Sequence, residues 1–135
     1  MQEPRSPFAK SSVLIVEDDS ALRDLYRSAL RSAGHVVVAV PDGADALRYL
    51  EQRRPSAVVL DLALPRVGGR DVHRELKARP ETRDIPVIVV TGTDTTGLNP
   101  NDFASLLMKP IDPDMLVWTV DNSIRRTRAR SAKPT

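Results

Sequence analysis

Apolar and polar positions along the chain follow two alternating patterns. The first is a short run that is apolar almost throughout, which is typical of strands buried on both faces of a parallel sheet. Such runs cover residues 12–16, 36–40, 57–60, 87–90 and 105–108. The second pattern places apolar residues three and four positions apart and predicts amphipathic helices. These helices lie between Ser20 and Gly34, between Gly43 and Pro55, over residues 71–79, and from Pro113 to about Arg128.

Strands that alternate with helices predict an α/β fold in which helices cover both faces of a parallel sheet. Five such units in a chain of 135 residues match the flavodoxin-like doubly wound fold, a five-stranded parallel sheet with strand order 2-1-3-4-5. We expect one domain over residues 11–128, with a flexible arm of residues 1–10 before it and a basic tail or linker of residues 129–135 after it. In this fold, ligands bind beyond the carboxyl ends of the strands.

Composition excludes several classes of function. The chain has no cysteine, which excludes a disulfide scaffold, a zinc ribbon and thiol catalysis. Its apolar runs are too short to span a bilayer and it shows no secretory signal, so we expect a cytoplasmic protein without membrane contact. The net charge of +2 comes from the C-terminal end, where Arg125, Arg126, Arg128, Arg130 and Lys133 lie. We therefore expect no direct binding of nucleic acid. No Walker motif appears, so the sequence predicts no nucleotide site.

Polar residues follow four of the predicted strands. Glu17 and Asp18 come after the first strand, Asp61 after the third, Thr91 after the fourth and Lys109 after the fifth. Because the carboxyl ends of parallel strands meet at one edge of a sheet, we expect these side chains to converge there. Crowded carboxylates repel one another, and a divalent cation with oxygen ligands relieves that repulsion. The sequence therefore predicts a Mg²⁺ site at this edge.

Four segments carry these residues: 13–19 (VLIVEDD), 59–65 (VLDLALP), 86–92 (PVIVVTG) and 108–110 (MKP). In this order and spacing, they resemble the receiver domains of response regulators in two-component signalling. The resemblance extends over about residues 12–128. It implies that Asp61 is the phosphoacceptor, which attacks a phosphohistidine of a partner protein.

The resemblance also implies a ligand set for Mg²⁺. Glu17, Asp18 and Asp61 would hold the ion together with the backbone carbonyl of Ala63. Of the acidic pair, Asp18 would be the direct ligand, whereas Glu17, whose side chain is one carbon longer, would act through water.

The remaining implied roles concern the phosphoryl oxygens. Lys109 would pair with Asp61 before the reaction and with a phosphoryl oxygen after it, aimed by a cis peptide bond before Pro110. Thr91 would donate a hydrogen bond from its hydroxyl to another phosphoryl oxygen and would move when Asp61 is phosphorylated. The family usually carries an aromatic residue three positions before the lysine, which moves with the threonine. Leu106 occupies that position, so we expect an altered switch.

The segment between the fourth and fifth strands departs from the family pattern. Residues 93–102 are rich in turn formers and poor in helix formers, and they are fewer than the family's usual span. We expect the fourth helix to be truncated or disordered. This matters because receivers commonly signal through the face that this helix helps to form.

Four further residues receive structural interpretations. Ser20 is expected to cap the first helix. His35 and His73 lack partners at metal-ligand spacing, and His73 is expected on the exposed side of its helix. Trp118 is expected to pack at the edge of the core.

The sequence thus predicts a phosphoacceptor receiver of a two-component or phosphorelay system, a signalling domain that catalyses only its own phosphorylation and slow dephosphorylation. Its partners would be a sensor histidine kinase or phosphotransfer protein and a downstream protein target, and the domain would be a monomer or weak dimer. Two alternatives stay open. One is an interaction module that binds a partner without phosphorylation, and the other is the receiver fragment of a larger regulator or hybrid kinase.

Overall fold

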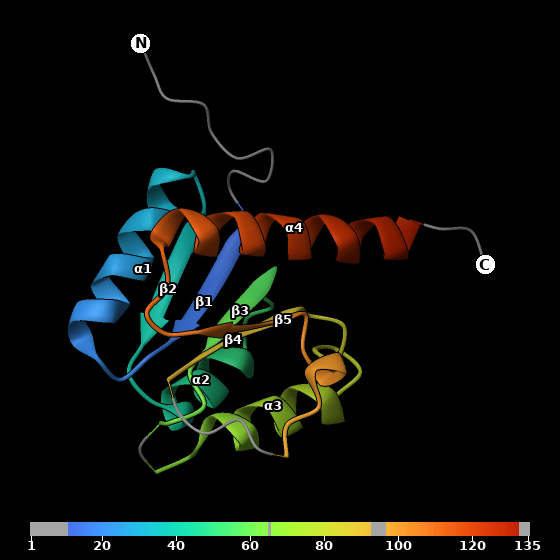
Figure 1. Ribbon diagram of the computed structural model, residues 1–135. Helices are drawn as coiled ribbons and strands as arrows, with labels where there is room; N and C mark the ends of the chain where they lie inside the picture. Colours follow the sequence, from blue (N-terminus) through green and yellow to red (C-terminus); the bar gives the residue numbers. More distant parts are fainter. Residues whose placement is uncertain (1–10, 65, 93–96, 133–135) are drawn as a thin grey trace.

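A five-stranded parallel sheet with the order β2-β1-β3-β4-β5 forms the centre of the molecule, which confirms the predicted fold class (Figure 1). The computed structural model describes residues 11–64, 66–92 and 97–132. The strands are β1 (Ser12–Val16), β2 (Val36–Val40), β3 (Ala57–Leu60), β4 (Val87–Thr91) and β5 (Ser105–Met108). The α-helices in the described residues are α1 (Ser20–Ser32), α2 (Gly43–Leu50), α3 (Gly69–Ala78) and α4 (Pro113–Ala132).

Helices cover both faces of the sheet, α1 and α4 on one side and α2 and α3 on the other (Figure 1). Successive side chains of a strand point to opposite faces, so β1 contributes to both cores. Val13 and Ile15 pack in the cluster beneath α1 and α4, whereas Leu14 and Val16 pack in the cluster beneath α2 and α3. This double burial explains why the strands are apolar throughout rather than alternating.

The start of α1 differs from the prediction. Asp19, rather than Ser20, is the N-cap, because its carboxylate accepts a hydrogen bond from the backbone N–H of Leu22 at 3.1 Å. Ser20 is the first helical residue. The cap places the beginning of α1 directly after the acidic pair that follows β1, and so fixes where that pair lies.

Helix α4 is longer than predicted. It continues to Ala132 rather than ending near Arg128, so residues 129–132 extend the helix instead of forming a separate tail. The helix stays intact because the sequence has no glycine or proline between Asp114 and Lys133. Within the described ranges, no helix combines the length and the apolar character that crossing a membrane requires. The predicted arm of residues 1–10 and residues 133–135 lie outside the described residues.

The prediction for Trp118 is wrong, because its side chain is 60% exposed. The buried stripe of α4 consists of Leu116, Val120 and Ile124. At 3.6 residues per turn, position 118 lies about 200° from both 116 and 120 and therefore faces away from the core.

Among the described residues, α4 is the fourth α-helix along the chain, and it is not truncated: it has 20 residues. The helix that was predicted to be truncated or disordered is a different one, expected in the segment between β4 and β5. The described part of that connection, residues 97–104, contains a single 3₁₀ turn, η1 (Pro100–Asp102), and residues 93–96 lie outside the described residues. Within this part, Phe103 packs against the core beneath α2 and α3.

His73 connects α3 to η1, which corrects the expectation that it only faces solvent. Its Nε2 lies 3.1 Å from the carbonyl oxygen of Asp102, and its ring centroid lies 4.6 Å from that of Phe103. Burial lowers the pKa of His73. The neutral imidazole therefore joins the short β4–β5 connection to the preceding helix.

Candidate functional site

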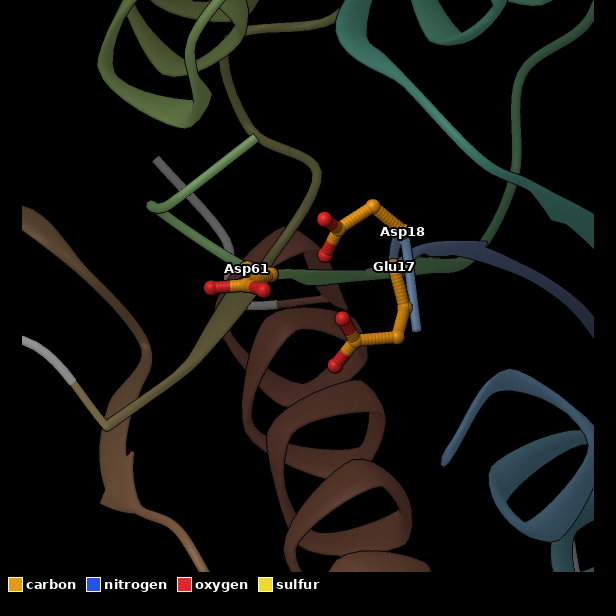
Figure 2. Close-up of side chains that lie close together, drawn as sticks. All are labelled: Glu17, Asp18 and Asp61. Atoms are coloured by element: carbon orange, nitrogen blue, oxygen red, sulfur yellow. The ribbon is translucent and has the colours of Figure 1, made fainter. Parts of the chain in front are cut away.

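Three carboxylates meet at the carboxyl ends of β1 and β3. The parallel register pairs Val16 of β1 with Leu60 of β3, so the next residues along each strand, Glu17 and Asp61, become neighbours. Asp18 follows directly, and one carboxylate oxygen from each of the three residues lies within 4.8 Å of the others. Figure 2 shows the side chains of Glu17 and Asp18 leaving the end of β1 beside Asp61.

Lys109 supplies a positive charge to this cluster. The register of β4 and β5 pairs Thr91 with Met108, and the backbone N–H of Lys109 donates to the carbonyl oxygen of Thr91 at 3.0 Å. The Lys109 Nζ then lies 3.1 Å from Asp61 Oδ2 and 2.7 Å from Glu17 Oε1. The peptide bond between Lys109 and Pro110 is cis, as the resemblance implies.

Burial dominates the electrostatics of the cluster. Glu17 is 1% exposed and Asp61 is 4% exposed, whereas Asp18 is exposed. The pKa of Glu17 is raised from 4.5 to about 7, mainly by desolvation; the hydrogen bond with Lys109 lowers this pKa, and the neighbouring Asp61 raises it. Burial also lowers the pKa of Lys109, but its hydrogen bonds with Glu17 and Asp61 outweigh that effect and raise it overall. Lys109 is therefore a cation at neutral pH.

Backbone groups hold the carboxylates in place. The N–H of Asp19 donates to Glu17 Oε2 at 3.2 Å, and the N–H of Ala63 donates to Asp61 Oδ1 at 3.0 Å. Arg23, in the first turns of α1, donates from Nη1 to the carbonyl oxygen of Glu17 at 2.9 Å. Sequence reasoning missed Arg23, because a contact from a helix back to the preceding strand end has no distinctive spacing.

Gly69 is a second residue that sequence reasoning missed. A Cβ at this position would lie 2.3 Å from the carbonyl oxygen of Asp61 and 2.6 Å from the Cα of Leu62, so only glycine fits without a backbone shift. The start of α3 consequently packs directly against the loop that carries Asp61. The Gly68–Gly69 pair was the available signal, since a glycine beside a helix start often marks a close backbone approach.

The remaining predicted residues lie at different distances from the cluster. Thr91 is the last residue of β4 and is fully buried at the same edge of the sheet. Ala63 lies two residues after Asp61 and is exposed. Leu106 packs against the cluster beneath α2 and α3, as Phe103 does, rather than among the polar residues.

The donor set fits a divalent cation that prefers oxygen ligands. The carboxylates of Glu17, Asp18 and Asp61 are clustered. Among the described residues, no ion pair gives Asp18 a cationic partner. The raised pKa of Glu17 reflects a site in which negative charge is costly. A bound cation would relieve that cost.

Comparison with known proteins agrees with this geometry. Residues 13–121 match the family described as the response regulator receiver domain. The response regulator MprA of Mycobacterium ulcerans is 33% identical over 123 residues, which cover 86% of this chain and 51% of that protein. The MprA protein of Mycobacterium tuberculosis is 33% identical over 127 residues, covering 89% of this chain and 53% of that protein. The chain thus spans about half the length of these curated relatives.

Solved structures of receiver domains are also similar to this chain. The signal receiver domain of a Luxo repressor protein from Vibrio parahaemolyticus matches with a TM-score of 0.81 at 28% identity, covering 90% of this chain and 95% of that one. The receiver domain of a sensor histidine kinase from Pseudomonas aeruginosa matches with a TM-score of 0.77 at 28% identity, covering 87% and 99%, and that structure has a magnesium ion coordinated in its active site cleft. With the family match extending over most of the sheet and its polar edge, this chain belongs to the response regulator receiver domains of two-component signalling.

Proposed function

We propose that this receiver takes a phosphoryl group onto Asp61 from a phosphohistidine of a sensor histidine kinase or phosphotransfer protein, in a Mg²⁺-dependent reaction in the cytoplasm. The observation that carries the proposal is the position of the Asp61 carboxylate. Its Oδ2 lies 3.1 Å from the Lys109 ammonium, and the carboxylates of Glu17 and Asp18 lie beside it in the same cluster. A downstream protein target would then respond to the phosphorylated domain.

The Asp61 carboxylate acts as the nucleophile. One of its oxygens forms a bond to phosphorus while the bond between phosphorus and the histidine nitrogen breaks, and the imidazole leaves with the electron pair. The product is an acyl phosphate. The hydrogen bond from the Ala63 N–H to Asp61 Oδ1 holds the carboxylate in orientation. Phosphoryl transfer depends mainly on positioning and on neutralising charge, and a fixed carboxylate meets the first need.

Neutralising the charge on the phosphoryl oxygens requires positive charge close to Asp61. Lys109 Nζ would move from its two carboxylate partners to an equatorial phosphoryl oxygen, where its raised pKa keeps it protonated. Glu17, Asp18, Asp61 and the backbone carbonyl of Ala63 would hold Mg²⁺, with Asp18 as a direct ligand because it is the exposed member of the acidic pair. Bound Mg²⁺ supplies positive charge to the phosphoryl oxygens.

Thr91 and Leu106 would carry the response to phosphorylation. Thr91 lies at the same edge as Asp61 and would donate its hydroxyl to a phosphoryl oxygen. Leu106 is half-buried two residues before the exposed Met108, and the register pairs it with Val89 in the neighbouring strand. We propose that the switch operates by aliphatic repacking around Leu106 rather than by rotation of an aromatic ring.

Phosphorylation by a small donor tests the proposal. With acetyl phosphate and Mg²⁺, the wild-type chain should gain one phosphoryl group, seen by intact-mass spectrometry, and EDTA should prevent the gain. Asp61→Asn should abolish the gain, and Asp18→Ala should reduce it at limiting Mg²⁺. Asp24→Asn is the matched control, because Asp24 lies on α1 and is exposed, outside the cluster. A folded wild-type chain that takes up no phosphoryl group would favour the alternative of a phosphorylation-independent interaction module.

A further inference from the structure

A cleft of about 630 Å³ opens at the end of the sheet opposite to Asp61. Its walls are the start of β4 with the loop before it, the η1 region before β5, Lys77 near the end of α3, and the C-terminal half of α4. Val87 begins β4 and Ala104 precedes β5, so the cleft lies at the amino ends of these strands. The phosphoacceptor chemistry proposed above uses none of the residues that line it.

Four cationic side chains converge on this cleft from separate parts of the chain. Lys77 lies in the last turn of α3, Arg83 precedes β4, and Arg126 and Arg130 lie one turn apart on α4. The ion pairs among the described residues include none of these four cations, and the Lys77 Nζ donates to the carbonyl oxygen of Arg83 at 2.9 Å. Guanidinium groups that lack a carboxylate partner are suited to binding phosphate in a bidentate manner.

The cleft also has an apolar part and hydrogen-bond acceptors. Pro86 and Val87 are buried in its wall, and Phe103 is held there by the ring of His73 at 4.6 Å. Two carboxylates, Asp84 and Asp102, also line the cleft. They reduce the net positive charge but can accept hydrogen bonds from amino or hydroxyl groups, which a nucleotide carries on its base and its ribose.

We propose that this cleft binds a nucleotide. Its phosphates would contact Arg126 and Arg130, and its base would lie against the apolar wall formed by Pro86 and Phe103. A volume of about 630 Å³ suits a ligand of that size. Because the sequence has no phosphate-binding loop, side-chain cations rather than backbone N–H groups would provide the recognition.

Isothermal titration of the full chain with ATP tests the proposal. The buffer contains EDTA and no divalent cation, so that the Asp61 site contributes no metal-bridged binding. We expect saturable binding of one ATP, weakened at least about tenfold by Arg126→Ala and by Arg130→Ala. Arg125→Ala is the matched control, because it removes the same charge from an exposed neighbour outside the cleft and should change the affinity less than about twofold. Thermal unfolding verifies that each variant is folded.

Three further probes identify the ligand class. Adenosine lacks the phosphates and inorganic triphosphate lacks the base, so each should bind at least about tenfold more weakly than ATP. Triphosphate binding as tight as ATP would overturn the proposal in favour of non-specific attraction, and hexaglutamate binding as tight as ATP would overturn it in favour of an acidic peptide. Equal losses in Arg125→Ala and Arg126→Ala, or no saturable ATP binding, would also overturn it.

Discussion

The pH dependence of stability tests the electrostatics of the acidic cluster. Burial raises the pKa of Glu17 from 4.5 to about 7 in the folded protein, so Glu17 keeps its proton at pH values where the unfolded chain has lost it. The unfolded state therefore binds fewer protons in this window. Raising the pH from about 4.5 to about 7 then lowers the free energy of unfolding, and stability from this residue is greatest at low pH.

Replacing Glu17 with glutamine isolates this effect, because glutamine mimics the protonated side chain at every pH. The difference between the Glu17 pKa of 4.5 in the unfolded chain and about 7 in the folded protein corresponds to a loss of about 3 kcal/mol in the free energy of unfolding, once Glu17 is ionised in both states. We expect Glu17→Gln to exceed the wild type in free energy of unfolding by about 2 to 3 kcal/mol near pH 8, and by under about 1 kcal/mol near pH 5.

Urea unfolding followed by circular dichroism, in EDTA and at a series of pH values, measures the difference. Glu81→Gln is the matched control, because it makes the same substitution at an exposed carboxylate outside the acidic cluster. Mg²⁺ at about pH 8 should narrow the gap, since it stabilises the ionised wild-type cluster. A difference between Glu17→Gln and wild type that stays constant from about pH 5 to about pH 8 would refute the reasoning.

Two further substitutions test the packing around the site. Gly69→Ala places a methyl group 2.3 Å from the Asp61 carbonyl oxygen, so urea unfolding should show a loss of about 1–3 kcal/mol, together with slower phosphorylation by acetyl phosphate. Gly68→Ala, whose nearest contact would be 3.7 Å, should leave both nearly unchanged, and equal effects of the two would contradict this account. His35→Ala removes the buried 2.8 Å contact with Asp121 and should cost about 1–3 kcal/mol by urea unfolding, whereas an unchanged midpoint would show that the pair is not stabilising.

Much of the fold and of the acidic cluster could be predicted from local patterns. Strands buried on both faces are apolar throughout, so their bounds and the polar residues that follow them are visible in the sequence. The parallel order then places those polar residues at one edge. This is why the approach of Glu17, Asp18 and Asp61 follows from the strand ends alone.

Contacts between distant segments could not be predicted in the same way. His35 pairs with Asp121 across 86 positions, and nothing in the spacing of either residue indicates a partner. The contact of Arg23 could not be predicted either, because its guanidinium donates a hydrogen bond to the backbone carbonyl of Glu17 rather than to a charged side chain. The exposure of Trp118 was predicted wrongly because a large aromatic residue suggests burial, whereas its angular position on α4 decides the outcome.

The identity of the phosphorylated residue tests the central claim most directly. After reaction with acetyl phosphate and Mg²⁺, borohydride reduction converts a phosphorylated aspartate to homoserine, which tandem mass spectrometry can locate. Asp61 is the only acidic residue between Arg54 and Arg66, so its tryptic peptide gives an unambiguous assignment. We predict homoserine at position 61 in the wild-type chain and none when EDTA replaces Mg²⁺. Homoserine at another aspartate, with position 61 unmodified, would contradict the account.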